Sequence, residues 1–339
     1  MKTILPLLFL LIAALLACTH EKSQKETVLD EVVTMYDEIF YDVPEVPRWC
    51  DRLRFEGKHI NIGDAELYVE VEGEGMPMVL LHGGPGGTHH YFHPHFSHAA
   101  DFAQVIYYDQ RGCGLSDFEP GEGYTIQQAA NDLESLRQAM GYDQWVVVGY
   151  SYGGLLAQLY ATKFPESLAG LVLLSSAVSL NIELEPSRQY DFISEEEQDW
   201  MQEINQMPDL TREQIIFNRY LNGDWKRQFF YRPSKERIAE FARYEWMHDR
   251  EFRNGIIESL HPLDLEGAFK DFPVPTLIFE GKWDLTWNTD KPEVIHNIHP
   301  NAEMVVIEQA GHSPFADQPD EFFGELQNFI ESLNGDHGH

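Results

Sequence analysis

The stretch Trp145-Val146-Val147-Val148-Gly149-Tyr150-Ser151-Tyr152-Gly153 decides how this chain folds. Its first four residues form a short apolar run, typical of a strand buried on both faces. The residues from Leu155 to Phe164 then have a helical pattern. Between them, the pattern G-x-S-x-G puts a serine on a strand-to-helix turn that is too tight for side chains beside it. The sequence therefore predicts that the Ser151 hydroxyl stands above the carboxyl end of a strand, where a nucleophile would lie.

Further apolar runs alternate with helical segments on both sides of this stretch: Met78 to Leu81, Val105 to Tyr108, Leu171 to Leu174, Thr276 to Phe279 and Met304 to Ile307. A hairpin pattern around Gly63-Asp64 precedes them. Strand, helix and strand in repetition predict an α/β fold, with a mostly parallel central sheet and helices on both faces. We assign the sheet and its helices to residues 55–179 and 266–335.

Residues 180–265 interrupt this alternation because they contain helical patterns but no strand-like run. Ser194-Glu195-Glu196-Glu197 has the spacing of a capping box, which begins a helix. We interpret the range as a helical cap inserted between the sixth and seventh strands of the sheet.

The charge balance excludes one class of partner. The 339 residues include 24 Lys or Arg and 56 Asp or Glu, which gives a formal net charge of −32. Such an excess repels phosphate backbones, so nucleic acid binding by a broad basic surface is excluded. Acidic lipid headgroups are repelled for the same reason.

The first residues have the pattern of a targeting signal. Lys2 precedes an apolar run from Ile4 to Ala17, too short for a membrane span, and Leu15-Leu16-Ala17-Cys18 resembles a bacterial lipoprotein boundary. The resemblance implies a signal peptide at 1–17, acylation of Cys18, and a lipid-anchored spacer at 18–54. The protein is then expected in the cell envelope, on the periplasmic or outer-surface side of a membrane. An ordinary secretory signal is the alternative, and no disulfide is predicted between Cys50 and Cys113.

A serine nucleophile needs a base, and the base needs a carboxylate that orients it. On folds of this kind the chain order is Ser, then Asp or Glu, then His. Asp284 follows the run that ends at Phe279, and His312 follows the run that ends at Ile307. Because the carboxyl ends of parallel strands assemble sites at one edge, we predict a triad of Ser151, Asp284 and His312.

An oxyanion hole is the remaining requirement of such a site. His82-Gly83-Gly84-Pro85-Gly86 follows the strand-like run that ends at Leu81, where glycines let the backbone approach a reacting oxygen. We predict that the backbone N–H groups of Gly84 and Tyr152 form the hole. A phosphate-binding loop is the alternative for these glycines, but the spacing of the known phosphate motifs is absent.

These motifs together resemble one known family. His82-Gly83-Gly84-Pro85-Gly86, Asp109-Gln110-Arg111-Gly112-Cys113-Gly114-Leu115-Ser116, the Ser151 elbow, Gly281-Lys282-Trp283-Asp284 and Gly311-His312-Ser313 are similar to the proline iminopeptidase family of α/β-hydrolases. The similarity runs from about residue 60 to 335. It implies the α/β-hydrolase fold and a serine peptidase without a cofactor, which releases an N-terminal residue, often proline, from a small peptide or amide. Cap carboxylates would hold the free amine of the substrate.

Glu245 is the candidate for amine binding. On a helix from Ser234 onward, Ile238, Phe241 and Phe252 share an apolar face, and Glu245 falls in its middle. A carboxylate there needs a partner, either a substrate ammonium or an internal ion pair, for instance with Arg243 or Arg253. Ala242-Arg243-Tyr244-Glu245 also resembles the segment that carries one amine-binding glutamate of the family. The family's second such glutamate follows a Trp, whereas Lys226 follows Trp225 here.

Five histidines lie close together in the sequence, at positions 89, 90, 93, 95 and 98. They could bind a metal, but no Cys or Glu interleaves with them and the predicted fold requires no metal, so we predict no metal site.

Three functions remain open from the sequence alone. The first is the aminopeptidase that the resemblance implies. The second is an esterase or amidase that acts on an apolar acyl compound without amine recognition. The third is a lipoprotein that binds a ligand on an inactive scaffold, which would require a broken triad.

Overall fold

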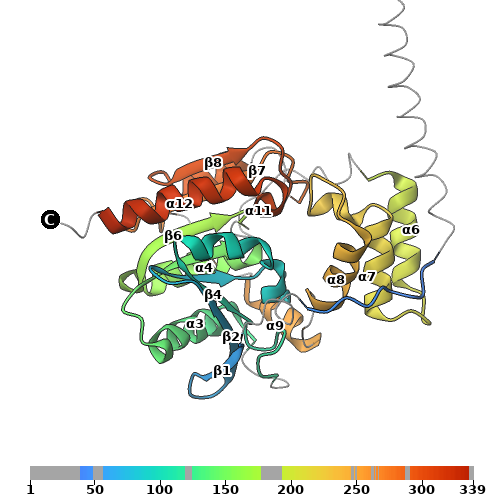
Figure 1. The fold of residues 1–339 in the computed structure, drawn as a ribbon, viewed down its shortest axis with the longest axis horizontal. Coiled ribbons are helices and arrows are strands. Elements are labelled where there is room, and N and C mark those ends of the chain that lie inside the picture. The colour runs from blue at the N-terminus through green and yellow to red at the C-terminus, as the bar shows by residue number, and fades with distance from the viewer. Residues whose placement is uncertain are drawn as a thin grey trace, which may run out of the picture.

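The computed structural model describes residues 39–48, 56–118, 124–176, 193–245, 248, 250–260, 263, 265, 267–286 and 291–335. An eight-stranded sheet with the order β1-β2-β4-β3-β5-β6-β7-β8 lies at its centre (Figure 1). Its strands are β1 (Lys58–Asn61), β2 (Glu66–Glu72), β3 (Pro77–Leu81), β4 (Gln104–Tyr108), β5 (Trp145–Tyr150), β6 (Leu168–Leu174), β7 (Thr276–Gly281) and β8 (Glu303–Ile307).

The sheet is mostly parallel. β1 pairs with β2, and β2 with β4, in antiparallel register. All pairings from β4 through β3, β5, β6 and β7 to β8 are parallel. This confirms the predicted α/β fold, and each of the six apolar runs that follow the hairpin pattern lies within a strand.

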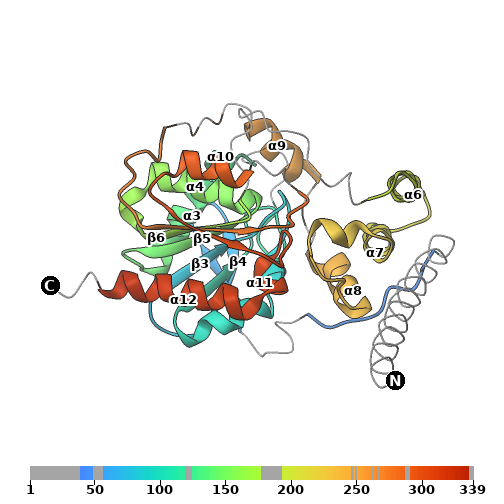
Figure 2. The same ribbon diagram turned by 90° about the horizontal axis from the view of Figure 1, so that it is seen from above.

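Helices cover both faces of the sheet (Figure 2). α3 (Ile126–Met140), α4 (Tyr152–Lys163) and α10 (Lys291–Ile298) lie on one face, and α11 (Pro314–Asp317) and α12 (Pro319–Gly335) on the other. The short 3-10 helices η1 (His89–Tyr91) and η2 (His95–Asp101) accompany α12, and η3 (Pro165–Ser167) leads into β6. Successive β5 side chains enter opposite cores, Trp145 and Val147 on the α4 face and Val146 and Val148 on the α12 face. This explains why the run is apolar throughout.

The helices between β6 and β7 form two groups. We call α6 (Glu195–Asn205), α7 (Arg212–Leu221), η4 (Asp224–Arg227) and α8 (Lys235–Tyr244) the cap helices, and they stand beside the sheet as a separate layer (Figures 1 and 2). α6 begins with the predicted capping box, in which Glu197 N–H donates to Ser194 Oγ and Ser194 N–H donates to the Glu197 carboxylate. α9 (Arg250–Leu260) packs instead against α3, where Ser259 Oγ accepts from Ile126 N–H at 2.9 Å.

One helix predicted from the sequence was wrong. The sequence predicts one helix whose apolar face carries Ile238, Phe241 and Phe252, with Glu245 in its middle. In the structure α8 ends at Tyr244, and Phe252 lies in α9. Between these two helices, His248 pairs with Cys113 in an isolated β-bridge. Periodicity alone does not reveal such a long-range backbone pairing.

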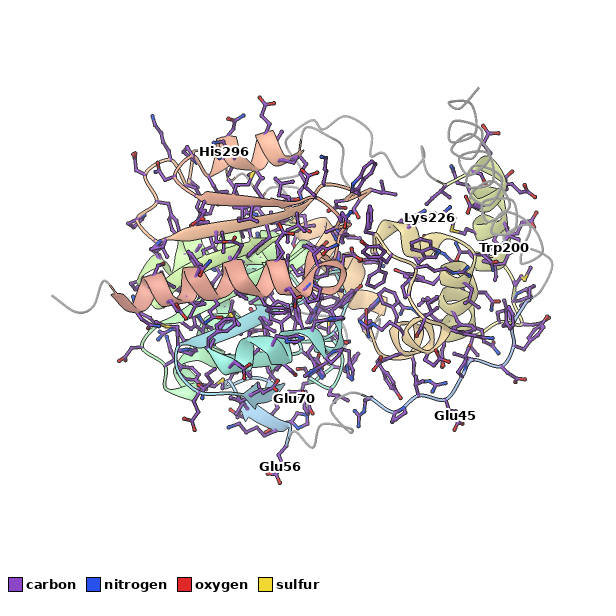
Figure 3. All side chains as sticks on the ribbon, turned by 45° about the horizontal axis from the view of Figure 1, so that its top comes forward. Glu45, Glu56, Glu70, Trp200, Lys226 and His296 are labelled. Carbon is purple, nitrogen blue, oxygen red and sulfur yellow. The ribbon has the colours of Figure 1, made fainter. Side chains whose placement is uncertain are left out.

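Residues 39–48, from the range predicted to be a spacer, lie along the cap helices. The backbone N–H and C=O of Phe40 bond to the Asn218 side chain at 2.8 and 2.9 Å, and Tyr244 Oη donates to Val46 O at 2.8 Å. The Lys235 ammonium lies 4.2 Å from the centre of the Phe40 ring. In Figure 3 Glu45 of this segment lies at the edge of the cap layer, away from Trp200 and Lys226.

The predicted signal at 1–17, Cys18 and Cys50 lie outside the described residues. In the part of the chain that the structure describes, no helix combines the length and apolar character needed to cross a membrane. Cys113 is a buried free thiol.

Candidate active site

Ser151 lies at the sharp turn between β5 and α4. Its φ and ψ are 55° and −119°, a strained conformation for a residue with a Cβ. The turn leaves no room for neighbouring side chains, because a Cβ on Gly149 would lie 2.4 Å from Gly153 O and one on Gly153 would lie 2.2 Å from Leu81 O. Ser151 N–H donates to Leu174 O at 3.0 Å, which ties the turn to β6.

Asp284 and His312 meet at the ends of β7 and β8. His312 Nδ1 donates to Asp284 Oδ2 at 2.7 Å, and Thr286 N–H donates to Asp284 Oδ1 at 2.9 Å. Burial alone would raise the pKa of Asp284, but the charge and hydrogen bond of His312, with Lys291 nearby, hold this pKa below its usual value. The ionised carboxylate fixes the proton of His312 on Nδ1, which leaves Nε2 as the basic nitrogen.

The loop that carries His312 is held by groups that the sequence reasoning missed. Gly311 N–H and Phe230 N–H both donate to Asp317 Oδ2 at 2.9 Å, so Asp317 joins the loop to the cap region. Ser313 N–H donates to Gln228 O, also at 2.9 Å. No sequence motif marks Gln228, Phe230 or Asp317.

Tyr150 links the two halves of the site. Its hydroxyl group bonds to Ser313 Oγ at 2.8 Å and to Gln228 Oε1 at 2.9 Å, and its ring centre lies 5.1 Å from that of His312. Tyr150, which precedes Ser151, therefore contacts both the predicted base His312 and its neighbour Ser313. The described residues show no hydrogen bond between Ser151 and His312; in active sites such a bond often tightens only with substrate present.

The predicted oxyanion loop lies directly against the serine. A Cβ on Gly83 would come within 3.1 Å of Ser151 Cβ, and Gly84 has a φ of 127° that favours glycine. Tyr152 begins α4, so its N–H belongs to the first turn, where backbone donors have no partner within the helix. Gly84 and Tyr152 thus belong to segments that flank Ser151, and their role as oxyanion donors stays a prediction.

The motif from Asp109 to Ser116 is held in place by buried polar contacts. The buried Asp109 carboxylate accepts from the N–H and Nδ1 of His89 at 2.8 and 2.9 Å and from Leu115 N–H at 2.8 Å. Arg111 donates to both oxygens of Asp132 at 2.8 Å. These contacts give the motif a structural role beside the site.

The five neighbouring histidines do not gather around one point. His93 Nε2 bonds to Glu70 Oε2 at 2.9 Å, and His89 Nε2 lies 3.5 Å from Glu70 Oε1. His95 and His98 contact phenylalanine rings instead. Glu70, His89 and His93 are the described residues whose ligand atoms, within 4.8 Å of one another, could hold a metal. Glu70 comes from β2, far away in sequence, and the expectation of no metal stays a prediction.

Glu245 is completely buried and forms an ion pair within the protein. Its Oε1 lies 2.6 Å from an Arg237 nitrogen, and Arg237 also approaches Glu240 Oε2 at 3.3 Å. Burial raises the pKa of Glu245 to about 7, although the Arg237 charge opposes this. The sequence suggested Arg243 or Arg253 as internal partners, but Arg243 pairs with Glu213 and the Arg253 side chain is outside the described residues.

A cavity of about 680 Å³ lies between the cap helices and the predicted site. Gly84 and Thr286 line it from the core, and Gln228 and His248 from the connecting segments. The cap contributes the remaining lining residues: Asn205, Arg212, Ile215, Ile216, Arg219, Tyr220, Asp224 and Arg227. A substrate could therefore reach the oxyanion loop through a space whose outer wall is the cap.

Comparisons with known proteins agree with this architecture. A family model of the alpha/beta hydrolase fold matches residues 76–319. The proline iminopeptidase of Saccharolobus solfataricus is 31% identical over 293 residues, 79% of this chain and 88% of the relative. That of Thermoplasma volcanium is 29% identical over 292 residues, which are 82% of this chain and 97% of the relative. An esterase from Exiguobacterium antarcticum superposes with a TM-score of 0.64 at 23% identity, over 81% of this chain and 100% of the esterase. The chain belongs to the α/β-hydrolase fold family.

Proposed function

We propose that this hydrolase is a serine enzyme that acts through Ser151, His312 and Asp284. His312 Nε2 takes the proton of Ser151 Oγ while the oxygen attacks a substrate carbonyl carbon, and then gives the proton to the leaving group. The N–H groups of Gly84 and Tyr152 stabilise the oxyanion. Water then hydrolyses the acyl-enzyme, with His312 again acting as the base.

One observation supports this proposal above all others. The 2.7 Å bond between His312 and Asp284 lies at the same sheet edge as the strained Ser151 turn, although the three residues are far apart in the sequence. A buried ionised carboxylate beneath a histidine orients the ring and stabilises its protonated form during the reaction. An ordinary loop histidine needs neither a buried carboxylate partner nor a strained serine turn at the same sheet edge.

The substrate class that we propose is a short peptide or amide with a free N-terminal proline or other small residue. The relatives at about 30% identity are proline iminopeptidases, which supports this class. Glu240 and Glu245 both approach the Arg237 guanidinium. A substrate ammonium that displaced this guanidinium would meet two carboxylates, which is how Glu245 could bind the amine.

The test of amine recognition uses a proline-linked fluorogenic amide and its N-acetylated twin. Because the pKa of Glu245 is raised to about 7 by burial, its carboxylate form increases as pH rises through this value. We expect the preference for the free amine, measured as the ratio of the two kcat/KM values, to rise over the same range. Glu245→Gln should lose the preference and its pH dependence but keep activity on the acetylated substrate.

Glu236→Gln is the matched control, since Glu236 is exposed on the same helix. Its preference for the free amine should equal that of the wild type. An equal rate on both substrates at every pH would contradict amine recognition and leave the serine chemistry intact.

A second candidate is an esterase or amidase that does not recognise an amine. The observation that favours it is the complete burial of Glu245 against Arg237, which already neutralises the carboxylate. The acetylated substrate distinguishes the two candidates, because only the second enzyme would cleave it as well as the free amine.

We also propose that acylated Cys18 anchors the protein to a membrane of the cell envelope, with residues 18–54 between the anchor and the enzyme. The apolar run and its boundary at Leu15-Leu16-Ala17-Cys18 support this. Cys18→Ser is expected to move the protein from the membrane fraction to the soluble fraction, measured by immunoblot. Cys50→Ser, as the control, should stay with the membrane; equal membrane association of Cys18→Ser would contradict the anchor.

A further inference from the structure

The cavity beside the predicted active site has a positive wall. Arg212, Arg219 and Arg227 line it, and Asp224 is the one acidic residue among its lining residues. This is unusual in a chain with a net charge of −32. A concave site concentrates the electrostatic potential of the groups that line it. Arginines in this cavity can therefore attract an anion even though the protein as a whole is acidic.

Two of the arginines in this wall share one carboxylate. Asp224 bonds to Arg219 at 2.6 Å and to Arg227 at 2.9 Å, so one carboxylate serves two guanidinium groups. Two described carboxylates of the cap helices have other partners, since Glu213 pairs with Arg243 and Glu197 pairs with Lys226. An anion that entered the cavity would therefore meet Arg219 and Arg227, two guanidinium groups that share a single carboxylate.

The third arginine stands next to the oxyanion loop. Arg212 donates to His248 Nε2 at 2.8 Å, so the His248 nitrogen is unprotonated in this bond. The His248 ring lies over Gly86, since a Cβ on that glycine would be 2.3 Å from the ring. The exposed Arg212 is thus positioned by a residue that contacts the loop beneath it.

The cavity also reaches the surroundings of the predicted triad. Thr286 lines the cavity and donates its N–H to Asp284, while Gln228 bonds to Tyr150 and to Ser313, the neighbours of Ser151 and His312. One molecule in the cavity could therefore place one group near the reacting atoms and another against the arginines. The cavity volume of about 680 Å³ lies within the range that holds small organic ligands.

We propose that this arginine wall binds a carboxylate group of the substrate, apart from the carbonyl that reacts. Guanidinium groups match carboxylates because their planar N–H donors form paired, charge-assisted hydrogen bonds. The carboxylate could belong to the leaving group, as the free C-terminus of a dipeptide, or to the acyl group. The inference rests on the proposed hydrolase function but does not require amine recognition.

The experiment measures kcat/KM for two substrate pairs that differ only in the carboxylate. Pro-Ala is compared with Pro-Ala-amide for the leaving side, and the 4-nitrophenyl monoester of glutaric acid with the 4-nitrophenyl ester of pentanoic acid for the acyl side. We expect at least one pair to favour the carboxylate about tenfold or more. Arg212→Gln and Arg219→Gln should each reduce that preference severalfold, with little change for the neutral member of the pair.

Arg243→Gln is the matched control, because this cap arginine pairs with Glu213 and does not line the cavity. It should keep the full carboxylate preference. Fluorophosphonate labelling of Ser151 verifies that each variant is folded. Equal rates within both pairs, or a preference that both cavity variants retain, would overturn the proposal. Cleavage of the esters without cleavage of either peptide would contradict the peptidase function alone, since the ester pair still reports on the arginine wall.

Discussion

Ser151→Ala is expected to lower kcat/KM by at least about ten-thousandfold and to abolish labelling by a fluorophosphonate probe. Loss of the hydroxyl removes the acyl-enzyme route, and in serine proteases removal of this group costs about a millionfold in turnover. The remaining rate would come from the oxyanion donors and substrate binding alone. The measurements are progress curves with the best substrate found and gel detection of the labelled protein.

Ser332→Ala provides the control for this experiment, since Ser332 is exposed on α12 and its hydroxyl donates to Phe329 O within the same helix. Its activity and labelling should match the wild type. If Ser151→Ala unfolds at the same temperature as the wild type and keeps its activity, Ser151 is not the nucleophile. The helix and strand that position the turn do not depend on the hydroxyl, so an effect on folding should be small.

The sequence could predict the sheet and the candidate triad because both depend on local signals. Asp284 and His312 follow strands directly, so their chain positions place them at the carboxyl edge once the sheet is parallel. Ser151 is marked by the glycines that its turn requires. In each case the feature that positions the residue, a preceding strand or neighbouring glycines, lies close to it in the chain. Pairing of the strands then brings the three segments together.

Partners without such local signals could not be predicted in the same way. Glu245 caps the end of α8 and pairs with Arg237 of that helix. Its helical stripe had suggested a continuation to Phe252 instead. Glu70 of β2 reaches His93 because β2 lies next to β4, which is a property of strand order. The arginine wall likewise forms only when α7 and η4 fold over the oxyanion loop.

The buried network around His89 carries the second large prediction. Asp109 and Glu70 lie on either side of this ring, at 2.9 Å from Nδ1 and 3.5 Å from Nε2, and all three side chains are almost fully buried. His89→Ala leaves two buried carboxylates without this partner, and breaking a buried pair typically costs about 3–5 kcal/mol. We expect a decrease of that size in the free energy of unfolding, measured by urea denaturation at pH 7.

His98→Ala is the matched control, because this histidine from the same cluster is exposed and its ring centre lies 5.3 Å from that of Phe323. Its free energy of unfolding should change by less than about 1 kcal/mol, as for most surface substitutions. His89→Gln should recover part of the loss, since its amide can donate one hydrogen bond but carries no charge. A loss for His89→Ala no larger than for His98→Ala would contradict the role of the network.

The pH dependence separates lost charge pairing from lost packing. Burial alone would raise the pKa of Asp109, but His89 outweighs it and holds this pKa at about 2; His89 and His93 together lower the pKa of Glu70 still further. In the wild type these carboxylates therefore stabilise the fold above about pH 4, the usual carboxyl pKa, and lose this effect as pH falls toward 2. Without His89 the pKa values of Asp109 and Glu70 rise, and at pH 7 their buried charges destabilise the variant. Acidification protonates these carboxylates and so removes the destabilisation. The stability difference between wild type and His89→Ala should consequently shrink from pH 7 to pH 4, whereas a difference caused only by the missing volume of the ring would stay constant.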